Sequence, residues 1–209
     1  MANISERPAR MTLPHALLAE LIRRYWVLGI ECSMLEVHHL AWLLVRQCHH
    51  HQLPDLLSIE FQARRYGPYA DSLRAVMAEA VDDLLCHDGD VISSSATIIW
   101  FNERRHSCLV ARLVMPDAQP YRGVVEAIDQ QIDGFQSPLG MEVLATLDWL
   151  IGQEHVEPTV EAIKEGLRHW PDDLAGQRKL RLFSDRLIAL ALDLLTGEAI
   201  LPPALAANR

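Results

Sequence analysis

One short segment, residues 61–73, limits the possible folds more than any other. Within it the apolar residues change from the alternating spacing of a strand to the spacing of a helix. Before it, over residues 57–64, apolar residues alternate with polar ones, which is the period of a half-buried strand. After it, apolar residues recur at helical spacing, which predicts an amphipathic helix over about 69–85. We expect Gly67 and Pro68 to form the corner, with Pro68 at the first helical position.

Four residues whose side chains often contact nucleic acids lie close together in the sequence at this corner: Arg64, Arg65, Tyr66 and Tyr69. Tyrosine rings stack on nucleic-acid bases and arginines bind phosphates, so the corner could be a contact surface. The alternative is a packing hinge, in which the rings join strand to helix and the arginines are solvated. We favour the packing hinge.

The remainder of the chain is mostly helical by pattern, with start and stop residues at several ends. Further helices are expected over residues 12–28, 33–49, 121–132, 138–151, 157–167 and 179–195. Two strands, 97–101 and 108–114, would join the strand near Phe61 in a three-stranded antiparallel sheet. The fold class is therefore α+β, mainly α: a helical domain with a small antiparallel sheet, winged-helix-like.

The expected domain organisation is a single domain over residues 12–197. It has two lobes, one of helices plus the small sheet over 12–115 and a helical one over 120–197. Residues 1–11 are expected to form a flexible arm, and residues 198–209 a tail after the stop at Gly197.

Composition limits the function. Half of the 209 residues are hydrophobic and 22% are charged, which is typical of a globular chain. The net charge of −9 makes direct nucleic-acid binding disfavoured and suits a basic partner. The first ten residues have no apolar core for a signal peptide, and no apolar run reaches the ~20 residues of a membrane span. We expect a cytoplasmic protein without membrane contact.

Motifs for catalysis and metal binding are missing from the sequence. It has no Gly-rich phosphate loop, no G-x-S-x-G elbow, no H-E-x-x-H pair and no C-x-x-C pair. Adjacent helical residues point about a hundred degrees apart, so neither His38 and His39 nor the three histidines 49–51 are expected to serve one site. We expect no metal, no cofactor and no enzymatic activity.

Acidic residues recur at helical spacing in two places. The candidate partner-binding residues are Glu126, Asp129, Asp133, Glu157, Glu161 and Glu165. Like charges at this spacing are mildly unfavourable for folding alone. One interpretation is a solvated face; the sharper hypothesis is that the carboxylates imitate nucleic-acid phosphates.

Two segments together resemble a known family. Residues 65–74 resemble the YGPYA-x-x-L-R segment of the C-terminal domain of the DarG antitoxins. Residues 132–150 resemble that domain's I-x-G-F-x-[ST]-P-x-G-M-E-L-L-A-T-V-x-W segment. The residues that carry both segments are Tyr66, Gly67, Pro68, Tyr69, Gly134, Ser137, Pro138, Gly140 and Trp149.

The resemblance implies a function. DarG proteins counteract DarT, a toxin that ADP-ribosylates thymidine on single-stranded DNA; their N-terminal macrodomain removes the modification, and their C-terminal domain binds the toxin. No macrodomain precedes residue 12, so ADP-ribose hydrolysis is not expected from this chain. The helix over 34–48 departs from the family pattern at His38, His39 and Trp42, which leaves the partner's identity open.

The sequence therefore predicts a non-catalytic antitoxin that binds and neutralises a DarT-like DNA ADP-ribosyltransferase toxin; imitation of DNA by acidic side chains is one way in which it would do so. One alternative is a winged-helix-type nucleic-acid-binding or operon-regulating module, using Arg64, Arg65, Arg104 and Arg105. The other alternative is an enzyme whose site is not visible in the sequence.

Overall fold

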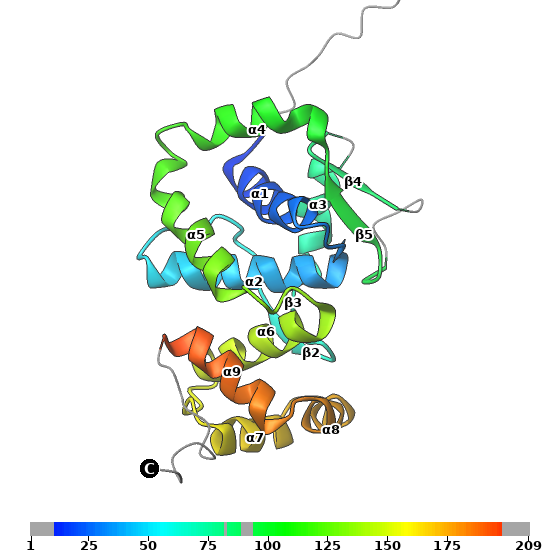
Figure 1. The fold of residues 1–209 in the computed structure, drawn as a ribbon, viewed down its shortest axis with the longest axis vertical. Coiled ribbons are helices and arrows are strands. Elements are labelled where there is room, and N and C mark those ends of the chain that lie inside the picture. The colour runs from blue at the N-terminus through cyan, green and yellow to red at the C-terminus, as the bar shows by residue number, and fades with distance from the viewer. Residues whose placement is uncertain (1–10, 82, 89–93, 198–209) are drawn as a thin grey trace, which may run out of the picture.

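The computed structural model describes residues 11–81, 83–88 and 94–197 (Figure 1). The expected tail, and the expected arm except Met11, lie outside these residues. The described helices are α1 Leu13–Val27, α2 Met34–His50, α3 Leu73–Ala80, α4 His106–Leu113, α5 Arg122–Gln131, α6 Pro138–Gly152, α7 Val160–Arg168, α8 Asp173–Leu182 and α9 Asp185–Thr196. The strands are β1 Cys32–Ser33, β2 Gln62–Arg64, β3 Gly67–Tyr69, β4 Leu85–His87 and β5 Ile98–Phe101.

The expected class, α+β and mainly α with a small antiparallel sheet, is confirmed. The sheet has the order β1-β5-β4, with both pairs antiparallel, and β2 and β3 form a separate hairpin. Figure 1 shows this hairpin between the body that holds α1 to α5 and the group formed by α6 to α9.

Two helix starts follow from local chemistry, as predicted. Ser33 caps α2: its hydroxyl accepts from the backbone of Glu36, whose carboxylate accepts in turn from Ser33. Ser137 caps α6 by accepting from the Gly140 backbone, and Pro138 occupies the first turn. These caps fix where α2 and α6 begin, and both helices contribute to the site described below.

The corner at Gly67 and Pro68 differs from the prediction. Both residues belong to β3, where Pro68 lies opposite Ala63, and the turn falls at Arg65 and Tyr66. Proline is tolerated there because the strand belongs to an isolated two-stranded hairpin. The following helix, expected over 69–85, is only Leu73–Ala80, since the strand pairing continues to Tyr69.

The strand expected over 108–114 is wrong: these residues lie in α4 and its C-cap. A short apolar run does not distinguish a strand from a helix, and here Asn102 caps a 3₁₀ turn, Glu103–Arg105, that leads straight into α4. The helix packs against α1 through Leu109, which is fully buried. The expected three-stranded sheet is therefore built from β1, β4 and β5 instead.

Two helix boundaries near the C-terminus are also corrected. The helix expected over 157–167 begins at Val160, because Thr159 is its N-cap. The single helix expected over 179–195 is two helices, α8 and α9. The chain breaks at the buried Phe183, after which the Ser184 hydroxyl caps α9 by accepting from the Leu187 backbone.

The core is continuous through α2, which is buried on nearly all sides and contacts α1, α5 and α6. A helix that is apolar all round is one that other elements surround. At the junction between α2 and α6, Arg46 Nε donates to Asp148 Oδ2 over 2.9 Å. None of the helices in the described residues is both long and apolar enough to span a lipid bilayer.

Candidate functional site

The two segments that resemble the DarG family meet in space. The hairpin formed by β2 and β3 packs on α2 and α6. Gly67 has φ +118°, and a Cβ there would lie 3.2 Å from His39 Nε2 and 3.3 Å from Thr146 Oγ1. Glycine is therefore required both by the backbone and by the space between α2 and α6.

His38 and His39, which were not expected to converge on one metal site, both contact this hairpin at different residues. His39 Nε2 donates to the Tyr66 carbonyl over 2.9 Å. His38 Nδ1 accepts from the Ala70 backbone over 3.3 Å, and its ring stacks on Tyr69 with 3.8 Å between centroids. His39 thus reaches the turn of the hairpin, whereas His38 reaches its far end at Tyr69 and Ala70.

Both imidazoles are neutral at neutral pH. Burial lowers the pKa of His38 to about 3, with further lowering by His39 and Arg74. Burial also lowers the pKa of His39 to about 4, although the hydrogen bond to Tyr66 opposes the shift. The two side chains therefore act here as hydrogen-bonding groups and as packing surfaces for the hairpin.

A buried charged cluster lies beside the hairpin, between α6 and α8. Lys179 is fully buried, and its Nζ lies 2.8 Å from Glu142 Oε1 and 3.1 Å from Thr146 Oγ1. Arg178 Nη1 also donates to Glu142 over 2.6 Å, and its guanidinium lies 4.9 Å from the centre of the Tyr66 ring. Burial lowers the pKa of Lys179, while the neighbouring Glu142 opposes the shift. The cluster joins α8 to α6 and, through Arg178, to the hairpin.

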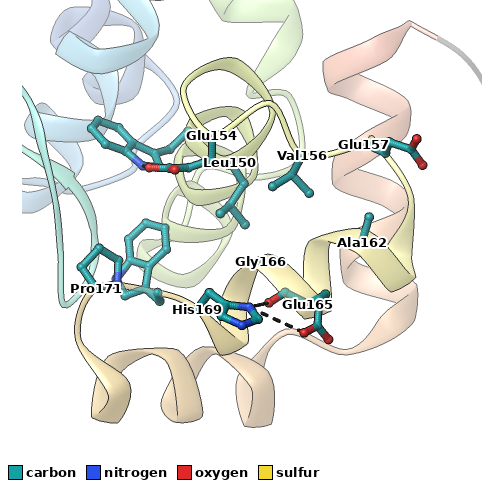
Figure 2. A pocket seen from close by; sticks show the side chains of 11 residues that line it. Leu150, Glu154, Val156, Glu157, Ala162, Glu165, Gly166, His169 and Pro171 are labelled. Carbon is teal, nitrogen blue, oxygen red and sulfur yellow. Dashed lines mark hydrogen bonds and ion pairs between the residues drawn. The ribbon is translucent and has the colours of Figure 1, made fainter.

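An acidic pocket of about 490 Å³ opens between the end of α6 and α7 (Figure 2). Its apolar lining includes Leu150 and Val156, and its polar groups include Glu154, Glu165 and His169. Figure 2 shows Glu154 near Leu150, and Glu165 beside His169. The lining is completed by Trp149, Glu157, Ala162, Gly166, Trp170 and Pro171.

Hydrogen bonds hold the polar groups of the acidic pocket. Trp149 Nε1 donates to Glu154 Oε1 over 3.3 Å. Glu165 pairs with Arg168, and its carboxylate lies 3.6 Å from His169 Nδ1. The pocket thus offers carboxylates against indole rings, an arrangement that suits a sugar or a cationic group more than a bare phosphate.

A second cavity, the arginine groove, measures about 440 Å³ and lies along the hairpin. Its lining includes Arg64, Arg65 and Arg74, together with Leu35, Tyr66, Gly67, Tyr69, Asp71, Ser95 and Asp172. The acidic pocket and the arginine groove are close neighbours, since Trp170 and Pro171 line the first and Asp172 lines the second. Trp170 also donates from Nε1 to the Arg64 carbonyl over 3.1 Å.

The first acidic set, from the range 157–165, is not one helical stripe. Glu157 precedes α7, whereas Glu161 and Glu165 lie on it, and all three are exposed. Only Glu157 and Glu165 line the acidic pocket. In the second set, Glu126 pairs with Arg122 and Asp129 with Arg24, each at 2.9 Å, while Asp133 is exposed beyond the end of α5.

The sequence reasoning missed the buried cluster of Glu142, Thr146, Arg178 and Lys179. One signal was present: Glu142 is the single acid in the apolar run 138–147, where a carboxylate needs a partner. That partner is 37 residues away, so the pairing itself was not visible. Among the residues that the structure describes, no group of three or more His, Cys, Asp or Glu side chains is arranged to hold a metal ion.

Comparison with known proteins relates the chain to DNA ADP-ribosyl glycohydrolases. It is 28% identical over 198 residues to proteins of that name from Mycobacterium tuberculosis (strain ATCC 25618 / H37Rv) and Mycobacterium bovis (strain BCG / Pasteur 1173P2), covering 88% of this chain and 52% of each relative. It is 26% identical over 195 residues to one from Thermus aquaticus (strain ATCC BAA-2747 / Y51MC23), covering 93% of this chain and 49% of the relative. The chain spans about half the length of these curated relatives. No family model matches it.

These relatives support a relation to the DarG type but correct the predicted function. They are named as hydrolases, which contradicts the expectations of a non-catalytic antitoxin and of no enzymatic activity. The expectations rested largely on missing catalytic motifs, and their absence does not exclude a site assembled in space. The alternative of a winged-helix-type nucleic-acid module is not favoured either.

Proposed function

We propose that this chain takes part in removing ADP-ribose from DNA, as the names of its relatives state for them. The observation that carries the proposal is the similarity to DNA ADP-ribosyl glycohydrolases over 88% to 93% of the chain. Because the chain spans about half the length of those relatives, their activity is carried over to this chain only as a proposal.

The acidic pocket is the place that we propose for the reaction. Hydrolysis of a glycosidic bond adds water across it, and enzymes commonly use two carboxyl groups on either side of the bond for this step. One group passes a proton to the leaving base, and the other stabilises the sugar cation or activates the water. Glu154 and Glu165, which both line the pocket, are the carboxylates that we assign to these tasks (Figure 2).

Single substitutions test this assignment. Purified wild-type chain and its Glu154→Gln and Glu165→Gln variants would be incubated with an ADP-ribosylated oligonucleotide, and free ADP-ribose measured by mass spectrometry. We expect each variant to release ADP-ribose roughly 100-fold or more slowly than wild type, because each loses a proton-transferring or charge-stabilising group. Glu161→Gln is the matched control, since Glu161 lies on α7 but does not line the pocket. Equal rates in all four proteins would refute the assignment.

We propose, as the competing assignment, that the shared half corresponds to the C-terminal domain of DarG-type proteins, which the resemblance links to toxin binding and not to hydrolysis. The support is that residues 65–74 and 132–150, which resemble that domain's two motifs, contribute to one packed unit of hairpin and α6. An experimental structure of a DarG C-terminal domain would test it. The same hairpin on the same helix is expected, and a different placement would refute the correspondence.

A protein partner is a separate proposal. The resemblance implies contact with a DarT-like DNA ADP-ribosyltransferase, and exposed carboxylates would meet its basic DNA-binding surface. Titration calorimetry at low and high salt would measure this binding for wild type and for a Glu157→Lys, Glu161→Lys double variant. We expect salt-sensitive binding that the double variant weakens; unchanged affinity would exclude these two residues from the interface.

A further inference from the structure

We propose that the arginine groove binds the phosphate groups of a nucleotide whose base stacks on Tyr69. That the nucleotide is the ADP-ribose unit carried by DNA rests on the proposed function. The chemistry of the groove does not, because it follows from the side chains that line the cavity.

The three arginines that line the groove outnumber its two aspartates. Asp71 lies 3.6 Å from Arg64, and the Asp172 carboxylate is engaged by the Leu174 and Ala175 backbones at the start of α8. No ion pair reaches Arg65 or Arg74 within the described parts of the chain. In a protein with a net charge of −9, neighbouring guanidinium groups without carboxylate partners suit an anionic ligand.

The hairpin backbone that presents Arg64 and Arg65 is held from both sides. Trp170 donates to the Arg64 carbonyl, and His39 donates to the Tyr66 carbonyl. The strand register fixes Arg64 opposite Gly67 across the turn. A site held in this way loses little conformational entropy on binding, which favours affinity for a small ligand.

The two tyrosines of the groove have different surroundings. The Tyr66 ring has Arg65 at 5.4 Å and Arg178 at 4.9 Å from its centre, so guanidinium groups already occupy it. Tyr69 is stacked on one side by the buried His38 ring, yet it is partly exposed and lines the groove. Tyr69 is therefore the ring that we assign to stacking with the base.

The size of the cavity agrees with such a ligand. A volume of about 440 Å³ lies within the usual range of roughly 300–1,000 Å³ for small-molecule sites. The neighbouring acidic pocket, beyond Trp170 and Pro171, would take the part of the ligand that carries no phosphate. An ADP-ribose unit whose diphosphate lies in the groove could thus place its far sugar toward Glu154 and Glu165.

Calorimetric titration of the full chain with ADP-ribose tests this inference, with adenosine as the phosphate-free probe. We expect saturable binding of ADP-ribose, binding of adenosine at least 10-fold weaker, and a loss of ADP-ribose affinity of at least 10-fold in the Arg65→Ser, Arg74→Ser double variant. The Arg104→Ser, Arg122→Ser variant is matched in charge, has its substitutions outside the groove, and should bind as wild type does.

The outcomes separate the two proposals. If ADP-ribose does not bind, or binds the three proteins equally, the groove is not a phosphate site, whatever the hydrolytic activity. If ADP-ribose binds through the arginines but ADP-ribosylated DNA is not hydrolysed, the groove assignment stands and the proposed function fails. Thermal melting of each variant verifies folding, and Arg74→Ser alone, whose side chain is exposed, provides a second variant with the same expected direction.

Discussion

At the scale of single residues, Gly67 and Glu142 hold the parts of the site together. Gly67 lets the hairpin approach α2 and α6 closely enough for His39 and Thr146 to line its backbone. Glu142 is the acceptor for two cations from α8, Arg178 and Lys179. Replacing Gly67 is therefore expected to weaken the packing of the hairpin on α2 and α6, and replacing Glu142 that of α8 on α6.

Replacing Gly67 with alanine should destabilise the protein by at least about 2 kcal/mol, because it adds both backbone strain and a close contact. The matched control is Gly29→Ala. Gly29 also has positive φ, at +71°, but a Cβ there would meet nothing within 4 Å, so about 1 kcal/mol is expected. Urea denaturation of both variants measures the difference; equal losses would mean that the packing of the hairpin on α2 and α6 contributes nothing.

The Glu142→Gln variant should lose roughly 3 kcal/mol of unfolding free energy, since it leaves the fully buried Lys179 without a counter-charge. Glu126→Gln breaks an ion pair with Arg122 that is largely exposed, and less than about 0.5 kcal/mol is expected. Chemical denaturation monitored by circular dichroism compares the two. A small loss in the Glu142 variant would show that Lys179 is not paired as described.

At the scale of secondary-structure elements, α2 is the element on which the hairpin depends. His38 and His39 contact the hairpin through uncharged rings, so protonation opposes this packing. The folded-state pKa values, about 3 and about 4, lie below the ordinary value of 6.5. Below pH 6.5 the unfolded chain therefore takes up protons that the folded chain does not. The stabilisation is full above pH 6.5 and is lost as the pH falls toward 4.

We therefore expect the unfolding free energy to fall by up to about 1.4 kcal/mol per pH unit for each of these histidines between pH 6.5 and 4. In a His39→Gln variant the amide can still donate to the Tyr66 carbonyl, so the slope should be shallower by about one histidine's share. His49→Gln, at an exposed position, should keep the wild-type slope. Denaturation at several pH values measures this, and identical slopes in all three proteins would show that an uncharged His39 does not support the hairpin.

The start of a helix could be predicted from the sequence where it depends on residues next to it in the chain. Ser33 with Glu36, and Ser137 with Pro138, gave the starts of α2 and α6 correctly. The run 108–114 was not readable, because a short apolar run fits either period and packing on α1 decides its structure. The sites could be predicted only in part. Arg64 and Arg65 were identified as candidates for phosphate contact. The surroundings of Arg74 and the partner of Lys179 could not be predicted, because they depend on residues far away in the sequence.

At the scale of the whole molecule, the hairpin is the junction on which both cavities depend. It packs on α2 and α6, its Arg64 carbonyl accepts from Trp170, and its arginines line the groove next to the acidic pocket. A cationic cavity beside an acidic one suits a substrate that carries phosphate groups at one end and a glycosidic bond at the other. We propose that this molecule acts on ADP-ribosylated DNA.

Release of ADP-ribose from DNA tests that claim most directly. A single-stranded oligonucleotide carrying one ADP-ribose would be mixed with an excess of purified chain, and both free ADP-ribose and unmodified oligonucleotide followed over time by mass spectrometry. We expect the two products to appear together, in equal amounts, and faster than in a protein-free control. No release above that control, from protein shown to be folded, would contradict it.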